Sequence, residues 1–197
     1  MKKYFYFIFL PLLSNIFFQT CNSDFPINER IYETGLKFQN QDAKTVVLMD
    51  DAENRIKLVG FVFTHCPDIC PMTINNMKLV QEALLKEGIS DPQFIAITFD
   101  PERDSIPVLK KYLEIREVNE GNFEFLTSTT QNINKLLDSF GVFAAAGDTT
   151  YIGSDPSYFF AHTDRIALVD QKNRIRKEYQ GSVINIEEIV NDIKKLR

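Results

Sequence analysis

Residues 56–71 read IKLVGFVFTHCPDICP, and this stretch decides the fold. Its first half, from Ile56 to Thr64, is an apolar run with β-branched residues, which is typical of a buried strand. Its second half holds Cys66 and Cys70, and a proline follows each cysteine. We therefore expect a cysteine motif at the end of a core strand. The motif alone fits a redox pair, a metal site or a structural disulfide.

An amphipathic helix is predicted directly after the cysteines. Its apolar residues recur at spacings of three and four until Gly88, at Ile74, Met77, Val80 and Leu84. Pro71 suits the first helical position, because it lacks an N–H group that would have no partner there. Pro71 also disfavours the helical conformation for Cys70, so we expect the helix to begin at Pro71, with Cys70 at its cap.

Strands and helices alternate in the rest of the chain. Further strands are predicted at residues 94–99 and 123–126, and further helices at 106–115 and 130–140. Residues 144–161 are rich in Gly, Asp, Ser and Pro and predict a loop. Residues 165–170 and 174–179 predict a β-hairpin, and Asn185 is expected to cap a last helix. This order predicts an α/β fold with parallel strands, specifically a thioredoxin-like sandwich with insertions.

The first residues have the pattern of an export signal. Two lysines precede an apolar stretch, which ends at Cys21 and a polar segment. Cys21 stands where a bacterial lipoprotein receives its lipid, although Phe18 and Thr20 replace the usual leucine and small residue. We therefore divide the chain into a signal peptide of the lipoprotein type (1–20), a tether with an N-terminal extension (21–45) and a thioredoxin-like domain (46–197). The domain is expected at the periplasmic face of the membrane, anchored by lipid.

Composition argues against several classes of function. The 197 residues carry a formal net charge of −5, and no cluster of Lys and Arg stands out, so nucleic acid is not an expected partner. The chain has no Gly-rich phosphate loop and no His-Glu-x-x-His motif, which removes the basis for a nucleotide-binding or zinc-protease function.

The two motif cysteines are expected to be reactive. If both lie at the start of a helix, its positive end favours the thiolate and lowers the thiol pKa. Three residues separate the cysteines, one more than in a thioredoxin-type active site. This spacing permits either a disulfide or coordination of one soft metal ion such as Cu(I) by both sulfurs. Cys66 and Cys70 are therefore our candidates for the metal site and for redox activity.

A third ligand would complete a trigonal copper site, and the chain offers two histidines. His65 directly precedes Cys66 on an extended segment, so its side chain is expected to point to the opposite face. His162 is the stronger candidate, because it lies at the end of the predicted loop, just before a strand. The aromatic residues at 158–160 are equally compatible with a core position and with a shield around the metal.

Three motifs together resemble the Sco/SenC family of copper proteins used in cytochrome c oxidase assembly. They are THCPDICP at residues 64–71, FDPERD at 99–104 and His162-Thr163, and the likeness runs from about Ile56 to Leu196. The resemblance implies a membrane-tethered thioredoxin-like fold in which Cys66, Cys70 and His162 hold copper as Cu(I) or Cu(II). It also implies a metallochaperone that delivers copper or electrons to the CuA centre. The oxidase subunit that carries this centre is the expected partner, with other copper chaperones as further partners.

One alternative from another class of function stays open. A thiol:disulfide oxidoreductase would use Cys66 or Cys70 to attack a disulfide of the oxidase subunit, and the other cysteine to resolve the mixed disulfide. Only this alternative dispenses with His162. The role of the FDPERD segment is also open. Asp104, or Ser105 directly after it, can cap the next helix, which would be a structural role, whereas Asp100 could tune the cysteines or contact the partner.

Overall fold

The computed structural model describes residues 29–31, 33, 35–50, 54–119, 121–152 and 155–197. The predicted signal peptide and Cys21 lie outside these residues. Among the helices of the described part, none has the length and apolar character needed to cross a membrane.

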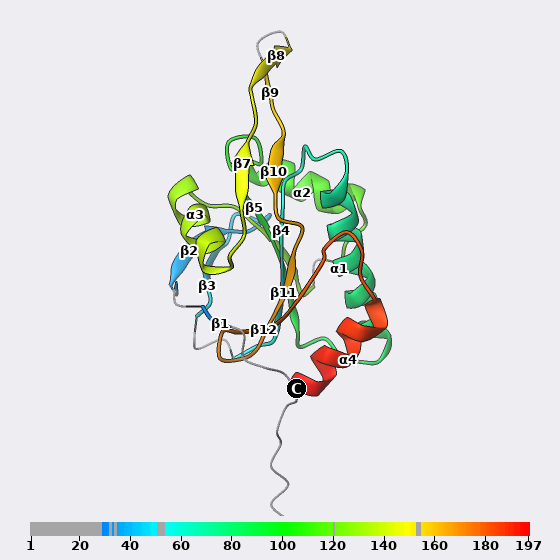
Figure 1. The fold of residues 1–197 in the computed structure, drawn as a ribbon. Coiled ribbons are helices and arrows are strands. Elements are labelled where there is room, and N and C mark those ends of the chain that lie inside the picture. Colours follow the sequence, from blue (N-terminus) through cyan, green and yellow to red (C-terminus); the bar gives the residue numbers. More distant parts are fainter. Residues whose placement is uncertain (1–28, 32, 34, 51–53, 120, 153–154) are drawn as a thin grey trace, which may run out of the picture.

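A six-stranded sheet forms the centre of the fold, in the order β1-β12-β11-β4-β5-β6 (Figure 1). Its strands are β1 (Glu29–Arg30), β4 (Lys57–Val62), β5 (Gln93–Thr98), β6 (Phe123–Leu126), β11 (Ile166–Val169) and β12 (Arg174–Tyr179). β4, β5 and β6 run parallel, whereas β11 runs antiparallel to β4 and to β12. The predicted parallel pairing and the C-terminal hairpin are therefore confirmed.

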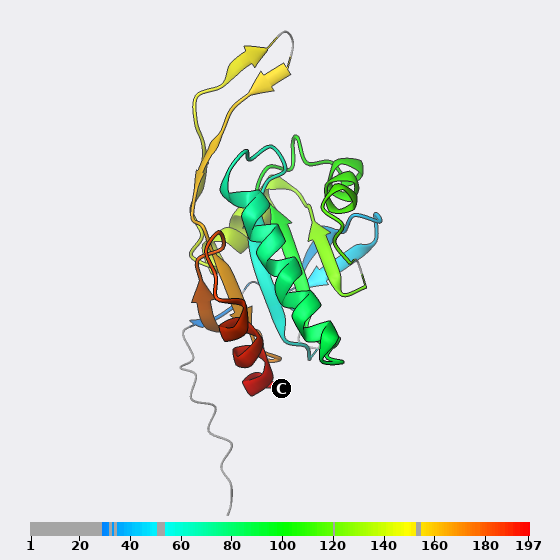
Figure 2. The ribbon, with the colours of Figure 1, turned by 90° about the vertical axis from the view of Figure 1, so that its right-hand side faces the viewer.

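Four helices of the described part of the chain pack around this sheet. They are α1 (Ile69–Lys86), α2 (Ile106–Ile115), α3 (Thr130–Ser139) and α4 (Ile186–Leu196). α1 and α4 pack side by side against one face, with β4 behind α1 (Figure 2). The predicted cap of the last helix is confirmed, because the side chain of Asn185 accepts a hydrogen bond from the backbone N–H of Glu188.

Helix α1 begins two residues earlier than expected. Its first residue is Ile69, so Cys70 lies inside the first turn instead of at the cap, and this part of the prediction is wrong. Pro71 is then the third helical residue. The position accepts proline because the first four N–H groups of a helix have no intrahelical partner. The correction matters because it moves Cys70 into the interior, where its side chain is fully buried.

The predicted loop at residues 144–161 is instead a long β-hairpin, which we call the arm. Its strands are β7 (Ala144–Ala146), β8 (Thr150–Ile152), β9 (Asp155–Ser157) and β10 (Phe160–His162), with β7 paired to β10 and β8 paired to β9. The arm projects from the body beyond the ends of β4 and β5 (Figures 1 and 2). Sequence patterns missed it because these short strands pair only with each other and so lack a strand's burial pattern.

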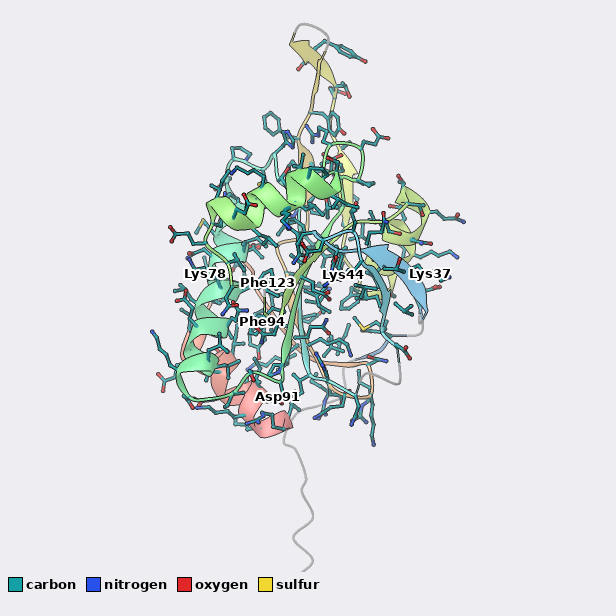
Figure 3. All side chains as sticks on the ribbon, turned by 180° about the vertical axis from the view of Figure 1, so that it is seen from behind. Lys37, Lys44, Lys78, Asp91, Phe94 and Phe123 are labelled. Atoms are coloured by element: carbon teal, nitrogen blue, oxygen red, sulfur yellow. The ribbon has the colours of Figure 1, made fainter. Side chains whose placement is uncertain are left out.

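A second hairpin, β2 (Leu36–Gln39) with β3 (Thr45–Leu48), was not predicted either. It packs into the core through Phe38 and Leu48, and Lys37 and Lys44 lie on its outer side (Figure 3). The side chain of Gln41 accepts a hydrogen bond from the N–H of Phe125 (2.9 Å) and donates one to the carbonyl of Phe123 (3.4 Å). The predicted domain boundary at residue 46 stays a prediction.

The core lies at the middle of the sheet. Every residue of β4, β5 and β11 is buried. Phe94 and Phe123 occupy neighbouring positions on β5 and β6 and stack, with ring centroids 6.0 Å apart (Figure 3). Because β4 lies inside this core, the cysteine segment at its end starts from a rigid support.

Candidate metal centre

Cys66 and Cys70 lie where strand β4 passes into helix α1. The backbone N–H of Cys66 donates a hydrogen bond to the carbonyl of Phe63 (3.4 Å), which closes a tight turn after the strand. Both cysteines are free thiols. They differ in access, because Cys70 is 0% exposed and Cys66 is 9% exposed. Solvent or a partner therefore reaches Cys66 more readily.

His162 joins the two cysteines from the base of the arm. It is the last residue of β10 and pairs with Ala144 of β7. Its Nε2 atom lies 3.6 Å from the Sγ atom of Cys70. The ligand atoms of Cys66, Cys70 and His162 all lie within 4.8 Å of one another. The structure thus brings together the three residues selected from the sequence.

The tautomer of His162 leaves Nε2 available as a ligand. Its Nδ1 atom lies 3.1 Å from the carbonyl oxygen of Thr163. A carbonyl oxygen only accepts hydrogen bonds, so Nδ1 carries the proton in this contact. The lone pair of Nε2 then faces the cysteine sulfur. A backbone carbonyl that fixes the tautomer in this way is a common outer-sphere partner of metal-binding histidines.

Aromatic rings surround the imidazole of His162. Its ring centroid lies 4.9 Å from that of Phe99 and 6.1 Å from that of Phe63. Phe160 packs against both phenylalanines and completes this aromatic wall. Phe160 thus belongs to the shield, whereas Phe159 is 60% exposed on the arm. The wall limits access of water to one side of the site.

A polar network fastens the arm to the body through the FDPERD segment. The hydroxyl of Tyr158 donates to Asp100 (2.9 Å), and the guanidinium of Arg103 donates both to Asp100 and to the carbonyl of Tyr158. Arg103 also stacks on the Tyr158 ring, 3.6 Å from its centroid. Burial, and then the neighbouring Asp100 carboxylate, raise the pKa of Tyr158 to about 12. Asp100 therefore helps to hold the arm against the body.

Asp104 fixes the segment that precedes the cysteines. Its buried carboxylate accepts hydrogen bonds from the N–H and hydroxyl of Thr64 and from the hydroxyl of Thr98. Burial raises the pKa of Asp104. Ser105, and not Asp104, is the cap residue of α2. The sequence suggested only capping for Asp104, because nothing in the linear pattern shows that Thr64, just after β4, and Thr98, the last residue of β5, lie within reach of its carboxylate.

His65 lies outside the group of three, in line with its assignment away from the ligands. Its side chain is half-exposed, and its Nδ1 atom lies 3.0 Å from the Thr64 hydroxyl and 3.7 Å from Asp104. His65 thus contacts the residues that anchor the loop.

The expected lowering of the thiol pKa is wrong for Cys70. Burial raises the pKa of this thiol, a hydrogen bond with the backbone of Phe63 opposes the rise, and the nearby Cys66 and Asp164 add to it. Desolvation outweighs the hydrogen bond with Phe63 because the side chain of Cys70 is fully buried, away from water. Cys70 is therefore a protonated thiol at neutral pH in the metal-free protein, and a metal ion must displace its proton.

The donor set defines what the centre can do chemically. Two cysteine sulfurs and one imidazole nitrogen suit a soft or borderline ion in a three-coordinate site. The fold and the site together define a thioredoxin-like protein with a Cys-Cys-His group that could hold a metal ion.

Sequence comparisons agree with this class. The family model described as SCO1/SenC matches residues 30–197, and the chain belongs to the SCO1/SenC family. An SCO2-like protein of Rickettsia felis is 36% identical over 132 residues, which cover 66% of this chain and 60% of the relative. The SCO1 protein homolog of Bacillus subtilis is 32% identical over 161 residues, which cover 80% of this chain and 78% of the relative. The match thus spans less than two thirds of the Rickettsia protein.

Solved structures share the fold. Bradyrhizobium japonicum ScoI with copper bound is 28% identical and has a TM-score of 0.67; the match covers 82% of this chain and 96% of the ScoI chain. A SCO1/SenC family lipoprotein from Bacillus anthracis is 28% identical and has a TM-score of 0.71; the match covers 86% of this chain and 96% of the lipoprotein chain. BsSco is described with a disulfide switch and as a member of the Sco family of cytochrome c oxidase assembly proteins. It is 30% identical and has a TM-score of 0.69, and the match covers 87% of this chain and 95% of the BsSco chain. The thioredoxin-like prediction is confirmed.

Proposed function

We propose that this protein is an extracytoplasmic metallochaperone that binds copper and helps to assemble the CuA centre of cytochrome c oxidase. The observation that carries the proposal is the convergence of Cys66, Cys70 and His162, whose ligand atoms lie within 4.8 Å of one another. The cysteines come from the end of β4 and the start of α1, whereas the histidine comes from the arm. A pair of structural thiols would not need an imidazole with its free lone pair aimed at one of them.

Copper fits this donor set better than other common ions. Two thiolates and one imidazole match the preference of Cu(I) for soft ligands and low coordination, and the imidazole also suits Cu(II). The Bradyrhizobium relative was solved with copper bound, which supports the same metal here. In a chaperone, this copper is cargo that arrives and leaves.

The difference in burial suggests how the cargo leaves. Cys70 is fully buried, whereas Cys66 is slightly exposed and His162 is partly exposed. A thiolate of the partner therefore approaches from the side of His162 and Cys66. His162 is displaced first, because it is neutral and binds a soft ion less strongly than a thiolate does. A second thiolate of the partner then replaces one cysteine, and the remaining cysteine dissociates and takes up a proton, so the ion would pass to the partner without being released to solvent.

Anchoring at a membrane is part of the same proposal. Cys21 is the site at which lipid would be attached, with residues 1–20 removed as a signal peptide. The Bacillus anthracis relative is described as a lipoprotein, which supports this assignment. The domain then faces the outer side of the cytoplasmic membrane, where the copper-bearing oxidase subunit is accessible.

Copper stoichiometry and affinity test the proposal. The full chain with Cys21→Ser, so that only Cys66 and Cys70 supply thiols, is purified in detergent, reduced and loaded with Cu(I) against a competing chelator. We expect one copper per chain. His162→Ala is expected to weaken binding by more than about 100-fold, because loss of a direct ligand exceeds the 10- to 100-fold losses typical of outer-sphere partners. His65→Ala is the matched control and should retain wild-type affinity. Absence of copper binding, or equal losses in both variants, would overturn the proposal.

A thiol:disulfide oxidoreductase is the second candidate. The two sulfurs lie within 4.8 Å of each other, and the BsSco structure is described with a disulfide switch. In this function the thiolate of one cysteine attacks a disulfide of the oxidase subunit, which forms a mixed disulfide and expels one thiolate of the subunit. The second cysteine then attacks the mixed disulfide, so that a Cys66–Cys70 disulfide forms and the reduced subunit leaves. The readout is the rate of reduction of a disulfide-bonded peptide. Rapid reduction that is unchanged in His162→Ala, together with failure to retain copper, would favour this candidate.

A further inference from the structure

The link between β10 and β11 is clamped from two sides. It consists of Thr163, Asp164 and Arg165, and it directly follows His162, the last residue of β10. On one side, the N–H of Thr163 donates to the carbonyl of Phe143 (2.9 Å), and the N–H of Phe143 donates to the hydroxyl of Thr163 (3.0 Å). These contacts tie the link to the base of the arm.

Asp164 makes the clamp on the other side. The N–H of Ser182 donates to both of its carboxylate oxygens (3.0 and 3.1 Å), and the hydroxyl of Ser182 donates to Oδ2 (2.5 Å). The hydroxyl of Thr73, which donates to the carbonyl of Ile69 (3.0 Å), also lies 3.5 Å from Oδ1. Thr73 follows Cys70 by three residues on α1, so the carboxylate packs the histidine segment against the helix that holds Cys70.

Gly181 shows how closely this junction is packed. A Cβ atom added to Gly181 would lie 2.6 Å from Asp164 Oδ1 and 2.7 Å from Thr73 Oγ1. The carbonyl of Gly181 also accepts a hydrogen bond from the side chain of Asn76 on α1 (2.9 Å). The loop before α4, helix α1 and the β10–β11 link thus meet at one point, which we call the Asp164 junction.

One peptide plane connects this junction to the candidate metal ligand. The carbonyl oxygen of Thr163 accepts the hydrogen bond from His162 Nδ1, and this oxygen belongs to the peptide group that joins Thr163 to Asp164. Because a peptide group is planar, holding Thr163 at one end and Asp164 at the other fixes the direction of the carbonyl. The carbonyl in turn fixes the tautomer and the orientation of the imidazole ring.

We propose that Asp164 is a positioning residue that, through Ser182 and Thr73, sets the orientation of the His162 imidazole relative to Cys70. The proposal rests on the copper-binding function proposed above. It assigns no metal contact to Asp164, which acts through the peptide plane. It also makes the loop at residues 181–182, which is remote from the cysteines in sequence, part of the support of the site.

Copper affinity in a double-mutant cycle tests this role. In the full chain with Cys21→Ser, Asp164→Ala is expected to weaken Cu(I) binding about 10-fold, the scale of outer-sphere effects on metal sites. Asp164→Asn keeps one acceptor oxygen and should lose less. Gly181→Ala perturbs the same junction from the opposite side and should resemble Asp164→Ala. When His162 is already Ala, Asp164→Ala should have no further effect, because its target is gone.

A second readout does not depend on copper. Imidazole ¹⁵N chemical shifts in the metal-free protein report which ring nitrogen of His162 carries the proton. We expect one dominant tautomer, protonated at Nδ1, in the wild type and a mixture of tautomers in Asp164→Ala. This measurement stays informative even when the wild-type protein fails to retain copper, so failure of the two proposals can be distinguished.

Asp192→Asn is the matched control, because Asp192 is a buried carboxylate that accepts hydrogen bonds from Lys177 and Tyr179 at helix α4. It should leave copper affinity and the imidazole signals unchanged. Equal loss of affinity in Asp192→Asn and Asp164→Ala would overturn the proposal. A loss from Asp164→Ala that persists without His162, or an unchanged tautomer in Asp164→Ala, would also overturn it.

Discussion

The two halves of the metal centre are supported in different ways. The cysteines follow β4, whose residues are all buried and which pairs with a strand on each side. His162 belongs to a two-stranded ribbon, held to the body by the Asp100–Arg103–Tyr158 network and by the aromatic wall. Apolar burial thus positions the cysteines, whereas the histidine is positioned by polar contacts from several short segments together with the aromatic wall.

The largest expected effect is on the core side. Phe61→Ala removes a buried β4 ring that packs edge-on against Phe140, with centroids 5.1 Å apart. We expect a loss of about 3–5 kcal/mol in the free energy of unfolding, measured with urea. Tyr151→Ala, near the exposed tip of the arm, should change it by less than about 0.5 kcal/mol. Comparable losses would show that the arm is part of the cooperative core.

Asp170 provides a pH-dependent test on the core side. Burial raises the pKa of its carboxyl, but hydrogen bonds from Arg174, Arg176 and the Lys172 backbone outweigh this effect and lower the pKa below 3.8. A lowered folded-state pKa contributes stability above the unfolded-state value, and this contribution is lost as the pH falls through the folded-state value. Asp170→Asn should therefore cost about 1.5–3 kcal/mol at neutral pH. Urea unfolding at several pH values should show the gap to wild type closing in acid. A gap that does not depend on pH would contradict this assignment.

Arg103 is the corresponding test on the arm side. Arg103→Met keeps an unbranched apolar side chain but removes the guanidinium, with its ion pair to Asp100 and its stacking on Tyr158. Hydrogen exchange should show protection of the β7 and β10 amides falling about tenfold, equivalent to about 1.4 kcal/mol. Amides of β4 and β5 should keep their protection. Equal changes in both regions would remove the distinction between them.

Tyr158→Phe should have the smallest effect. It deletes the hydroxyl that donates to Asp100 and keeps the ring beneath Arg103. The loss of one hydrogen bond to a buried carboxylate is expected to cost about 1 kcal/mol, seen as faster exchange of the arm amides alone. A loss as large as that in Arg103→Met would show that the hydroxyl, and not the guanidinium, fastens the arm.

The same contrast explains what could be predicted from the sequence. The elements around β4, β5 and α1 were predictable because continuous burial or a helical period leaves a local pattern. The arm was not, because its strands pair mainly with each other. His162 was selected from its place at the end of the predicted loop and from the family resemblance, because periodicity cannot show its contact with the cysteines. The early start of α1 was missed because proline is tolerated anywhere in the first helical turn, so Pro71 does not mark the first residue.

The amide of Gln41 has a consequence for how copies of this protein meet. β6 is the last strand of the sheet, and such a strand usually presents free backbone groups that can pair with another molecule. Here one side chain takes both the N–H of Phe125 and the carbonyl of Phe123. Because Gln39 also pairs with Thr127 through the backbone, the β2–β3 hairpin and Gln41 together occupy groups at this edge that another molecule could otherwise pair with.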